Sequence, residues 1–467
     1  MPLSRKVDVE ALPGNARTLT GSYGARYRDQ AVPRYELPDE GIPARAAYQA
    51  VSDELALDGN PMLNLATFVT TWMEPEADRL MADTVNKNSI DQDEYPQTVE
   101  IENRCVNILA RLFHAPAGAE SVGTATVGSS EAIHLAGLAL KWRWRKARDA
   151  AGEPTSTPNL VMSSSVQVCW EKFARYFDVE PRFVTNTHDR YVIDPDEAAS
   201  KVDENTIGVV GILGSTYTGE FEPIAELAAA LDGVQERTGL DVPIHVDAAS
   251  GGFVAPFTQP DLAWDFRVER VASINTSGHK FGLVYPGIGW GVWRDPSVLP
   301  EELVFHTNYL GGDEPTFDLN FSRGGGQIVA QYYNFLRLGR AGYTAVMRRL
   351  LETSNDLADA ARARGRLEVL SKPDALPLVC VRLPPDVSYD AFDVSHLLRE
   401  RGWIVPAYTL APNADDITVL RVVVRESLTR DLADLLLDDV HRAGQRLDSI
   451  GPVVPDRTRS GHTHGVC

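Results

Sequence analysis

Apolar residues recur along the chain in two patterns, one helical and one extended. Tyr48, Val51 and Leu55 have helical spacing and precede Gly59-Asn60-Pro61, a strong stop signal. A second helical stripe consists of Ile101, Cys105, Ile108, Leu109 and Leu112. Short apolar runs bounded by turn residues predict buried strands at 207–213, 244–246, 271–274 and 290–293. Short strands that alternate with helical stretches predict an α/β domain with a largely parallel sheet.

The pattern divides the chain into four predicted parts. The first, residues 1–61, is an irregular arm rich in Pro, Gly and charge, followed by one helix. The second, 62–345, is the large α/β domain. The third, 346–450, is a smaller α/β domain, with predicted helices at 357–364, 392–401 and 428–443 and a strand at 418–424. The fourth, 451–467, is polar and contains Pro452 and Pro455, which predicts a mobile tail.

Composition then limits the class of function. The chain has 467 residues, of which 43% are hydrophobic, and a net charge of −20. Such a chain buries a large core, and its acidity argues against nucleic acid as a partner, so a small-molecule substrate is expected. An anionic ligand then requires a local positive pocket. No segment has the roughly 18 uninterrupted apolar residues of a membrane span, and the N-terminus lacks the apolar region of a secretory signal.

The cysteines add a prediction about the cell compartment. Cys105, Cys169, Cys380 and Cys467 lie far apart and show neither a disulfide framework nor a zinc motif. We therefore expect a cytoplasmic protein with no metal site.

The strongest chemical signal is Ser-Gly-His-Lys-Phe-Gly at 277–282, which follows the predicted strand 271–274. A lysine flanked by small residues after a core strand is partly desolvated, which lowers its pKa and frees the amine of Lys280 to form a Schiff base. The alternative interpretation is a solvated loop lysine.

Two further segments suit the same chemistry. Asp247, at the end of a buried strand, is followed by small residues, and a carboxylate there would keep the ring nitrogen of pyridoxal phosphate protonated. Ser129 and Ser130 begin a long helical stretch, where hydroxyls and free N–H groups favour a phosphate. Each segment alone also fits a helix cap.

The order of these segments resembles that of fold-type I pyridoxal-phosphate enzymes, and more closely that of the glutamate decarboxylases. The resemblance covers about residues 55–437. It rests on the segments 63–68, 86–97, 127–132, 141–146, 216–219, 245–253, 277–282, 309–312 and 320–323. So many matches at consistent spacing are more specific than any single one.

The resemblance implies a fold-type I pyridoxal-phosphate-dependent transferase fold with a large, mostly parallel sheet and a smaller C-terminal α/β domain. It implies pyridoxal 5′-phosphate as cofactor and decarboxylation of L-glutamate to 4-aminobutyrate and carbon dioxide, with uptake of a proton. The implied catalytic residues are Lys280, Asp247 and His279. The implied cofactor-binding residues are Ser129, Ser130, Gln167, Thr216, Asp247, His279, Lys280 and Ser322. The implied substrate-binding residues are Thr67, Phe68, Asn88, Asp91 and Arg421.

The resemblance also distinguishes substrates. Gln167 falls where the related aromatic amino-acid decarboxylases have a His, whereas Glu171 departs from the His of some bacterial relatives. Arg421 is implied to pair with the α-carboxylate, the alternative being a structural ion pair in a strand. An aspartate such as Asp91 near the distal carboxylate requires one of the two to be protonated, so higher activity is expected in mild acid.

Partners follow from the same comparison. Ser322 and the pair Asn88 and Asp91 are implied to act across subunits, so a homodimer is the minimum and a homohexamer is compatible. His462 and His464 resemble a histidine-bearing tail that covers the site, the alternative being a solvated tail. Plant relatives bind calmodulin through a tail with Trp and clustered Lys; residues 451–467 have neither, so no calmodulin control is expected. The competing functions are decarboxylation of aspartate or an aromatic amino acid, and a non-catalytic scaffold.

Overall fold

The computed structural model describes residues 33–118, 121–307 and 314–454. By their internal contacts, the described residues up to Asn60 form one compact unit and those from Pro61 onward form a second, larger unit. In this first unit, the helix predicted around Tyr48, Val51 and Leu55 is present as α2 (Ala44–Leu55). Arm residues 1–32, tail residues 455–467 with His462 and His464, and the matched segment 309–312 lie outside the described residues.

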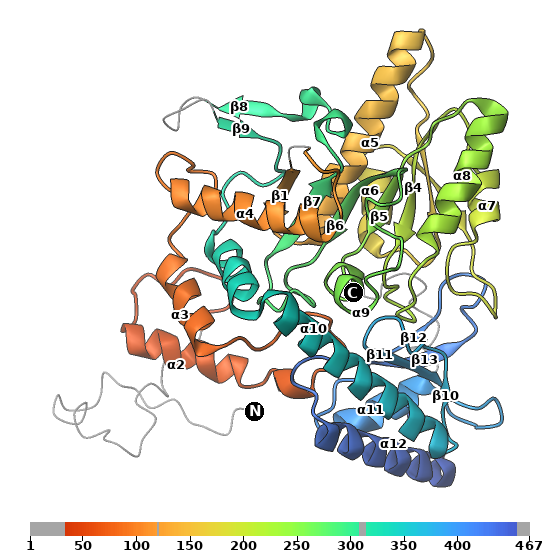
Figure 1. The fold of residues 1–467 in the computed structure, drawn as a ribbon. Coiled ribbons are helices and arrows are strands. Elements are labelled where there is room, and N and C mark those ends of the chain that lie inside the picture. Colours follow the sequence, from red (N-terminus) through yellow and green to blue (C-terminus); the bar gives the residue numbers. More distant parts are fainter. Residues whose placement is uncertain (1–32, 119–120, 308–313, 455–467) are drawn as a thin grey trace. The chain divides into compact units, whose positions relative to one another are not determined.

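A seven-stranded sheet forms the centre of the larger unit (Figure 1). Its order is β1-β7-β6-β5-β4-β2-β3, and only β7 runs against its neighbours. The strands are β1 (Val122–Thr126), β2 (Asn159–Ser163), β3 (Glu180–Val184), β4 (Thr206–Ile212), β5 (Ile244–Asp247), β6 (Val271–Thr276) and β7 (Gly289–Trp293). The predicted, mostly parallel α/β fold is therefore confirmed.

Helices cover both faces of this sheet. Successive strand residues point to opposite faces, and apolar side chains are buried on both. Leu160 and Met162 of β2 pack in the core of one face, while Val161 between them belongs to the core of the other. The helices of this part are α3 (Pro75–Thr84), α4 (Pro96–Leu112), α5 (Ser129–Ala151), α6 (Val168–Tyr176), α7 (Pro195–Ser200), α8 (Ile224–Thr238) and α9 (Ala255–Thr258). A small hairpin, β8 (Phe305–Thr307) and β9 (Glu314–Thr316), stands apart from the sheet.

The sequence explains where several of these helices begin and end. Pro75 and Pro96 stand at the first positions of α3 and α4, where the missing N–H costs nothing. The helix α5 ends at Gly152 and α8 at Gly239, both with the positive φ that glycine adopts without strain.

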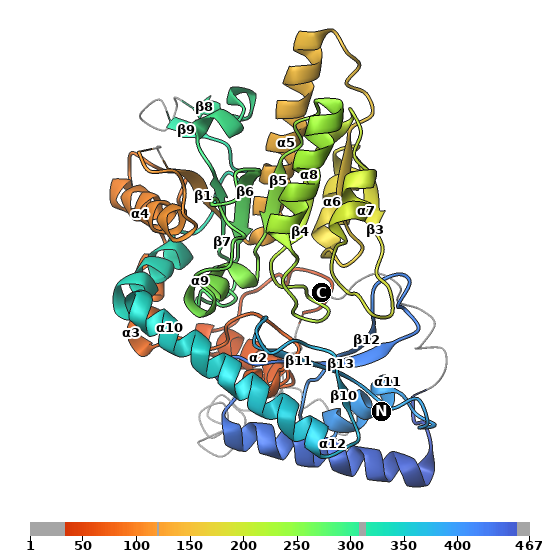
Figure 2. The same ribbon diagram turned by 45° about the vertical axis from the view of Figure 1, so that its right-hand side comes forward.

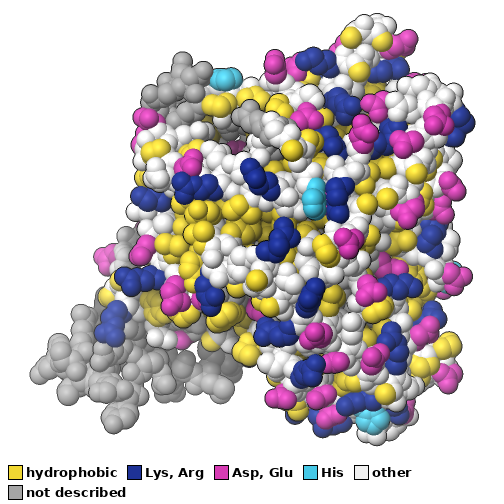
Figure 3. Space-filling view, viewed as in Figure 1, with side chains coloured by type: hydrophobic (Ala, Val, Ile, Leu, Met, Phe, Trp, Pro, Cys, Tyr) yellow, Lys and Arg dark blue, Asp and Glu magenta, His cyan; other side chains and the backbone are white. Residues whose placement is uncertain are grey.

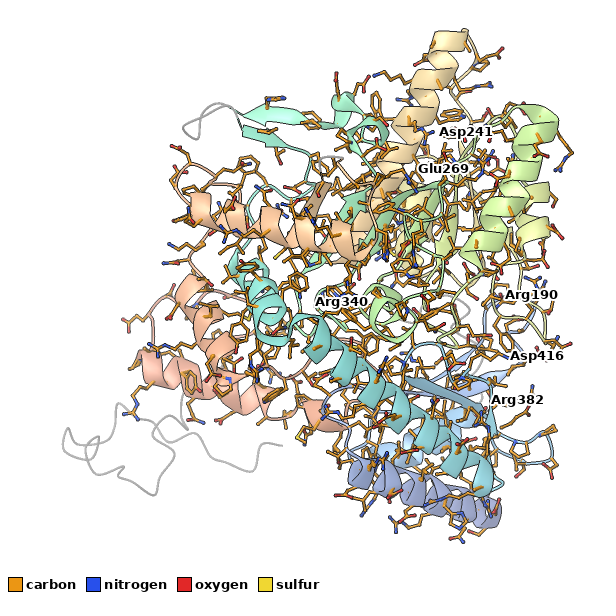
Figure 4. All side chains as sticks on the ribbon, in the orientation of Figure 1. Arg190, Asp241, Glu269, Arg340, Arg382 and Asp416 are labelled. Carbon is orange, nitrogen blue, oxygen red and sulfur yellow. The ribbon has the colours of Figure 1, made fainter. Side chains whose placement is uncertain are left out.

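A second, four-stranded antiparallel sheet follows, in the order β10-β11-β13-β12. Its strands are β10 (Glu368–Val369), β11 (Leu378–Arg382), β12 (Ala407–Thr409) and β13 (Thr418–Val423), and its helices are α11 (Ala391–Arg399) and α12 (Arg430–Ile450). Asp416, labelled in Figure 4, precedes β13 of this sheet. Its Oδ1 lies 3.0 Å from Nε2 of His188, which follows β3. No helix in the described ranges is apolar and long enough to cross a bilayer.

The helix α10 (Gly326–Ala363) connects the two sheets (Figure 2). It contacts α3, α4 and α9 along one part and β10, β11 and α12 along the other. Gly339, with φ of 56°, interrupts its helical geometry. The domain boundary predicted at residue 345 falls within α10, so one helix belongs to both predicted domains, and the boundaries at 61, 345 and 450 stay predictions.

One buried arginine fastens the segment that leads into the large domain. Arg425, only 2% exposed, donates to the carbonyl oxygens of Asn64, Val69 and Pro61 at 2.6, 3.2 and 3.3 Å. It also donates to Thr71 Oγ1 at 2.7 Å. A single guanidinium therefore fixes the backbone on both sides of residues 67 and 68.

We expect Arg425→Met to lower the free energy of unfolding by roughly 3 kcal/mol, because buried carbonyl groups lose their donors. The measurement is the urea midpoint at fixed protein concentration. Arg430→Met is the matched control, since Arg430 is 70% exposed in its ion pair with Asp356 and is worth at most about 1 kcal/mol. Equal shifts in the two variants would contradict the prediction.

Candidate cofactor and substrate site

Three predicted site residues lie at the carboxyl ends of neighbouring central strands. Asp247 is the last residue of β5, Lys280 follows the end of β6, and Thr216 follows the end of β4. Because β4, β5 and β6 are adjacent and parallel, these residues meet at one edge of the sheet. This edge is where open α/β sheets bind ligands.

The Asp247 carboxylate is buried and accepts hydrogen bonds from three elements. Oδ2 accepts from Trp170 Nε1 of α6 at 2.9 Å. Oδ1 accepts from Asn275 Nδ2 of β6 at 3.0 Å and from the backbone N–H of Ala249 at 3.1 Å. Of the roughly four lone pairs of a carboxylate, three are used, and the remaining one is on Oδ2.

Lys280 lies close to this acid in a partly buried position. Its Nζ donates to Ser250 Oγ at 3.1 Å and lies 5.3 Å from the centre of the Phe68 ring. Burial lowers the pKa of Lys280, an effect that the negative charge of Asp247 opposes. The amine is thereby brought nearer to the neutral form that a nucleophilic lysine needs.

The start of α5 forms a narrow cradle next to the lysine loop. Ser129 Oγ is 2.6 Å from Ser277 Oγ, and the His279 ring packs against Gly128. A Cβ on Gly289 of β7 would lie 2.4 Å from the carbonyl carbon of Gly128. The close approach of β7 to this turn therefore requires glycine, and the free N–H groups of α5 suit an anion.

His279 is neutral in this position. Burial, together with the nearby Lys280 charge, lowers the pKa of His279 to about 4. Its Nδ1 accepts from the backbone N–H of Ile288 at 3.3 Å, so Nε2 carries the proton. The ring is therefore a neutral donor beside the cradle.

Arg421 of β13, in the second sheet, supplies a buried positive charge next to Thr216. It is 1% exposed and donates to the carbonyl oxygens of Thr216 and Ala66, both at 2.7 Å. Its guanidinium lies 4.8 Å from the Phe68 ring centre, and its Nε has no hydrogen-bond partner. Within the described part of the chain, no carboxylate forms an ion pair with it.

The ring of Phe68 lies against both Lys280 and Arg421. This contact was not predicted from the sequence. A phenyl face attracts a cation but offers nothing to a carboxylate. Any contact of Phe68 with a carboxylate therefore comes from its backbone. Thr67 Oγ1 accepts from the N–H of Val69 at 3.0 Å, which stabilises the same turn.

Gln167 and Thr216 line one small cavity of about 150 Å³, together with Glu171 and Tyr217. Gln167 Oε1 also accepts from the N–H of Cys169 at 2.7 Å, so it caps α6. Ser130, in contrast, is exposed at the start of α5.

Asn88, Asp91 and Ser322 form a separate group, which we call the outer cluster. Asn88 Nδ2 donates to Asp91 Oδ1 at 3.2 Å and to Ser322 Oγ at 3.4 Å. Among the described residues, no hydrogen bond or ion pair joins the outer cluster to Lys280, Asp247 or Arg421. The chain thus brings the predicted site residues together in two groups.

Buried charges hold the segment that carries Ser322. Glu131 Oε1 accepts from the backbone N–H groups of Leu319 and Asn320 at 3.2 and 3.1 Å, while its Oε2 accepts from Val127 N at 2.7 Å. Arg323 donates to Asp318 Oδ2 at 2.8 Å. Glu131 therefore links the turn before α5 to the segment before Ser322.

Several residues of the site have no sequence prediction. Ser250, Ser277 and His245 lie within the matched segments but were assigned no role. Trp170 and Asn275 act on Asp247 from other elements. The pairing of Asp247 with Asn275 on adjacent strands is the signal that identifies Asn275, and it requires the strand register.

Comparison with known proteins identifies the family of the chain. Residues 33–384 match the model of the pyridoxal-dependent decarboxylase conserved domain. The glutamate decarboxylase of Petunia hybrida is 54% identical over 93% of this chain and 87% of its own length. Glutamate decarboxylase beta of Listeria innocua is 46% identical over 95% of this chain and 96% of its own length. A solved Lactobacillus brevis glutamate decarboxylase superposes with a TM-score of 0.89 at 45% identity, covering 94% of this chain and all of its own.

The chain therefore belongs to the pyridoxal-dependent decarboxylase family. Its relatives at this level of identity, in plants and bacteria, are glutamate decarboxylases.

The residues present fit the cofactor of this family, pyridoxal 5′-phosphate. The free lone pair of Asp247 Oδ2 suits a protonated ring nitrogen, and the cradle at Ser129 suits a phosphate. Asp247 and Lys280 lie at the carboxyl ends of the adjacent strands β5 and β6, so one compact ligand reaches both. The guanidinium of Arg421, which lacks an anionic partner in the described ranges, leaves a place for a carboxylate.

The neutral state of His279 predicts a pH dependence of stability. A histidine whose pKa falls from 6.5 to about 4 on folding contributes stability above pH 6.5, and this is lost as the pH falls toward 4. We expect cofactor-free protein to lose on the order of 1–2 kcal/mol through His279 between pH 7 and pH 5. In urea unfolding, His279→Gln should reduce the change in the free energy of unfolding with pH. The contribution of the buried His245 to this change remains. An unchanged slope would contradict the assignment.

Proposed function

We propose that the protein catalyses the pyridoxal-phosphate-dependent decarboxylation of L-glutamate to 4-aminobutyrate and carbon dioxide, with uptake of one proton. The observation that carries the proposal is the grouping of Lys280 and Asp247 at one edge of the large sheet with the buried Arg421, which reaches Thr216 at that edge from the second sheet. The identity to glutamate decarboxylases over almost the whole chain supports the choice of substrate.

In this proposal residues from several elements would hold the cofactor. Lys280 would bind it covalently through Nζ, and Asp247 would accept a hydrogen bond from the ring nitrogen. Ser129, Ser130 and His279 would bind the phosphate, and Thr216 and Gln167, which line one cavity, would contact the ring. When bound, the protonated ring accepts the electrons that the breaking bond to the carboxylate releases.

The two carboxylates of glutamate need different surroundings. Arg421 binds the α-carboxylate, because its guanidinium is fixed by two carbonyl groups and the Phe68 ring. A rigid guanidinium orients the bond that breaks, which selects decarboxylation over other reactions. Thr67 and the backbone of Phe68 receive the distal carboxylate, together with Asn88 and Asp91.

Lys280 has a second task after carbon dioxide leaves. Its Nζ would deliver a proton to the α-carbon of the substrate. The Ser250 hydroxyl, 3.1 Å away, keeps the amine in place. The lowered pKa of Lys280 makes the release of this proton easier.

Lys280→Ala is expected to abolish turnover and the visible absorbance of the lysine-bound cofactor. The measurements are carbon dioxide release from a panel of amino acids between mild acid and neutrality, and the absorption spectrum. Glutamate is expected to be the preferred substrate. Preference for aspartate or an aromatic amino acid would overturn the substrate, and turnover by Lys280→Ala would overturn the mechanism.

We also propose that the smallest active unit is a homodimer in which the outer cluster completes the partner's site. Support comes from the absence, among the described residues, of polar contacts between the outer cluster and Lys280. A cavity of about 710 Å³ lies beside Ser322, lined by Val85, Val127 and Ile328. Figure 3 shows apolar side chains gathered over α4 and the start of α10, and an exposed apolar patch marks an interaction surface.

A mixing experiment tests this sharing of residues. Lys280→Ala and Ser322→Asp are each expected to be inactive, the latter because an acid repels the phosphate. In a mixed dimer, one site combines the intact Lys280 of one chain with the intact Ser322 of the other. Co-expression should therefore restore part of the activity, whereas no recovery would place Ser322 in its own chain's site.

Control by calmodulin is not expected, because residues 451–467 contain neither Trp nor Lys. A site-covering role of His462 and His464 stays a prediction. Deletion of residues 461–467 tests it through the neutral limb of the pH–activity profile.

A further inference from the structure

A series of buried polar side chains on β5 and β6 leads to Oδ1 of Asp247. Ser273 Oγ is 2.8 Å from His245 Nδ1, and His245 Nε2 is 2.8 Å from Asn275 Oδ1. Asn275 Nδ2 then donates to Asp247 Oδ1 at 3.0 Å. All four residues are at most 5% exposed.

The chemistry of these groups sets the direction of each hydrogen bond. A carboxylate only accepts, so Asn275 must turn its NH₂ group toward Asp247 and its oxygen toward His245. His245 Nε2 must then carry the proton, and Nδ1 accepts from the Ser273 hydroxyl. Burial lowers the pKa of His245 to about 4, so the ring stays neutral and this one tautomer persists.

The register of strands β5 and β6 holds these hydrogen-bonded side chains next to one another. His245 pairs with Ser273 and Asp247 pairs with Asn275 on the adjacent strands β5 and β6. On its other side Asn275 pairs with Gly291 of β7, which brings no charge toward it. Within the described ranges, Asn275 thus faces one histidine and one carboxylate.

We propose that Asn275 and His245 are positioning residues that hold Asp247 ionised and oriented toward the ring nitrogen of the cofactor, with His245 acting by fixing the amide of Asn275. This inference rests on the proposed function.

The physical reason is competition for one proton. A hydrogen bond donated to a carboxylate stabilises its charged form and weakens its hold on a proton. The proton between Asp247 and the ring nitrogen then stays on the ring, where it makes the ring an electron acceptor. Loss of the Asn275 donor shifts the proton toward Asp247, although Asn275 touches neither cofactor nor substrate.

The first test is Asn275→Leu in the full-length holoenzyme. We expect kcat to fall about tenfold or more, with KM for glutamate within about twofold, since one hydrogen bond to a charged group is lost. The dissociation constant of pyridoxal 5′-phosphate, measured by reconstitution of the cofactor-free protein, should rise about tenfold. The absorbance of the bound cofactor should also titrate at a changed pH.

Asn159→Leu is the matched control. Asn159 is a fully buried strand asparagine of the same sheet that donates to Asp203 at 2.8 Å and accepts from Thr206, away from the site. It should lose stability without a change in the cofactor spectrum. If the two variants lose stability equally and their spectra and affinities match, the positioning role is overturned.

Asn275→Asp supplies a version that keeps the shape of the side chain. Its carboxyl group donates to Asp247 only when protonated, so kcat should recover in mild acid and fall as the pH rises, with a limb absent from the unaltered enzyme. A purely structural role for residue 275 predicts the unaltered pH profile, and that result would count against the proposal.

The part of His245 is tested by a double-variant cycle. His245→Leu should show the same defects to a smaller extent, and the double variant with Asn275→Leu should lose no more than Asn275→Leu alone. Additive losses would show that His245 acts independently. If the unaltered protein binds no pyridoxal phosphate, the proposed function fails as well; if it binds and decarboxylates normally but these variants match it, only the present inference fails.

Discussion

A buried negative charge at the end of β5 is the constraint on which the rest of the site depends. Asp247 is 5% exposed, and an isolated carboxylate there would be far less stable than in water. Donors from α6, from β6 and from the turn after β5 replace the lost water. The position of α6, the register of two strands and the geometry of one turn must therefore all be correct together.

The positive charges at the site are held in a different way. Arg421 is stabilised by carbonyl oxygens and aromatic rings, and Lys280 by a hydroxyl and the same Phe68 ring. A carboxylate partner for Arg421 would neutralise it and block an acidic ligand. The protein, with a net charge of −20, thus keeps a local attraction for anions at Arg421, because dipoles instead of a carboxylate support this guanidinium.

Sequence reasoning predicted what is encoded locally. The strands β5, β6 and β7 are short apolar runs between turn residues, and each was predicted to within about two residues of its bounds. The edge strand β3 is half-exposed and was not predicted, and of α10 only the last part was predicted, as a helix at 357–364. Lys280 and Asp247 were recognisable because their neighbours in sequence carry the signal.

The supporting residues could not be found in this way. Asn275 serves Asp247 only in the observed register, and a shift of one residue would turn its side chain to the other face of the sheet. Arg425 fastens a segment more than 350 residues away in sequence. Such roles arise from tertiary contacts between residues whose local sequence is ordinary, so only a structure reveals them.

Glu131 connects two parts of the structure, and this connection has a consequence for binding and assembly. One of its oxygens holds the turn before α5, and the other holds the segment that leads to Ser322. On the proposal that Ser322 serves the partner subunit, the phosphate cradle and the interface share a single anchor. Linkage then requires reciprocity: any factor by which dimerisation tightens cofactor binding is the factor by which the cofactor tightens the dimer. Where this factor exceeds one, added cofactor favours the assembled dimer.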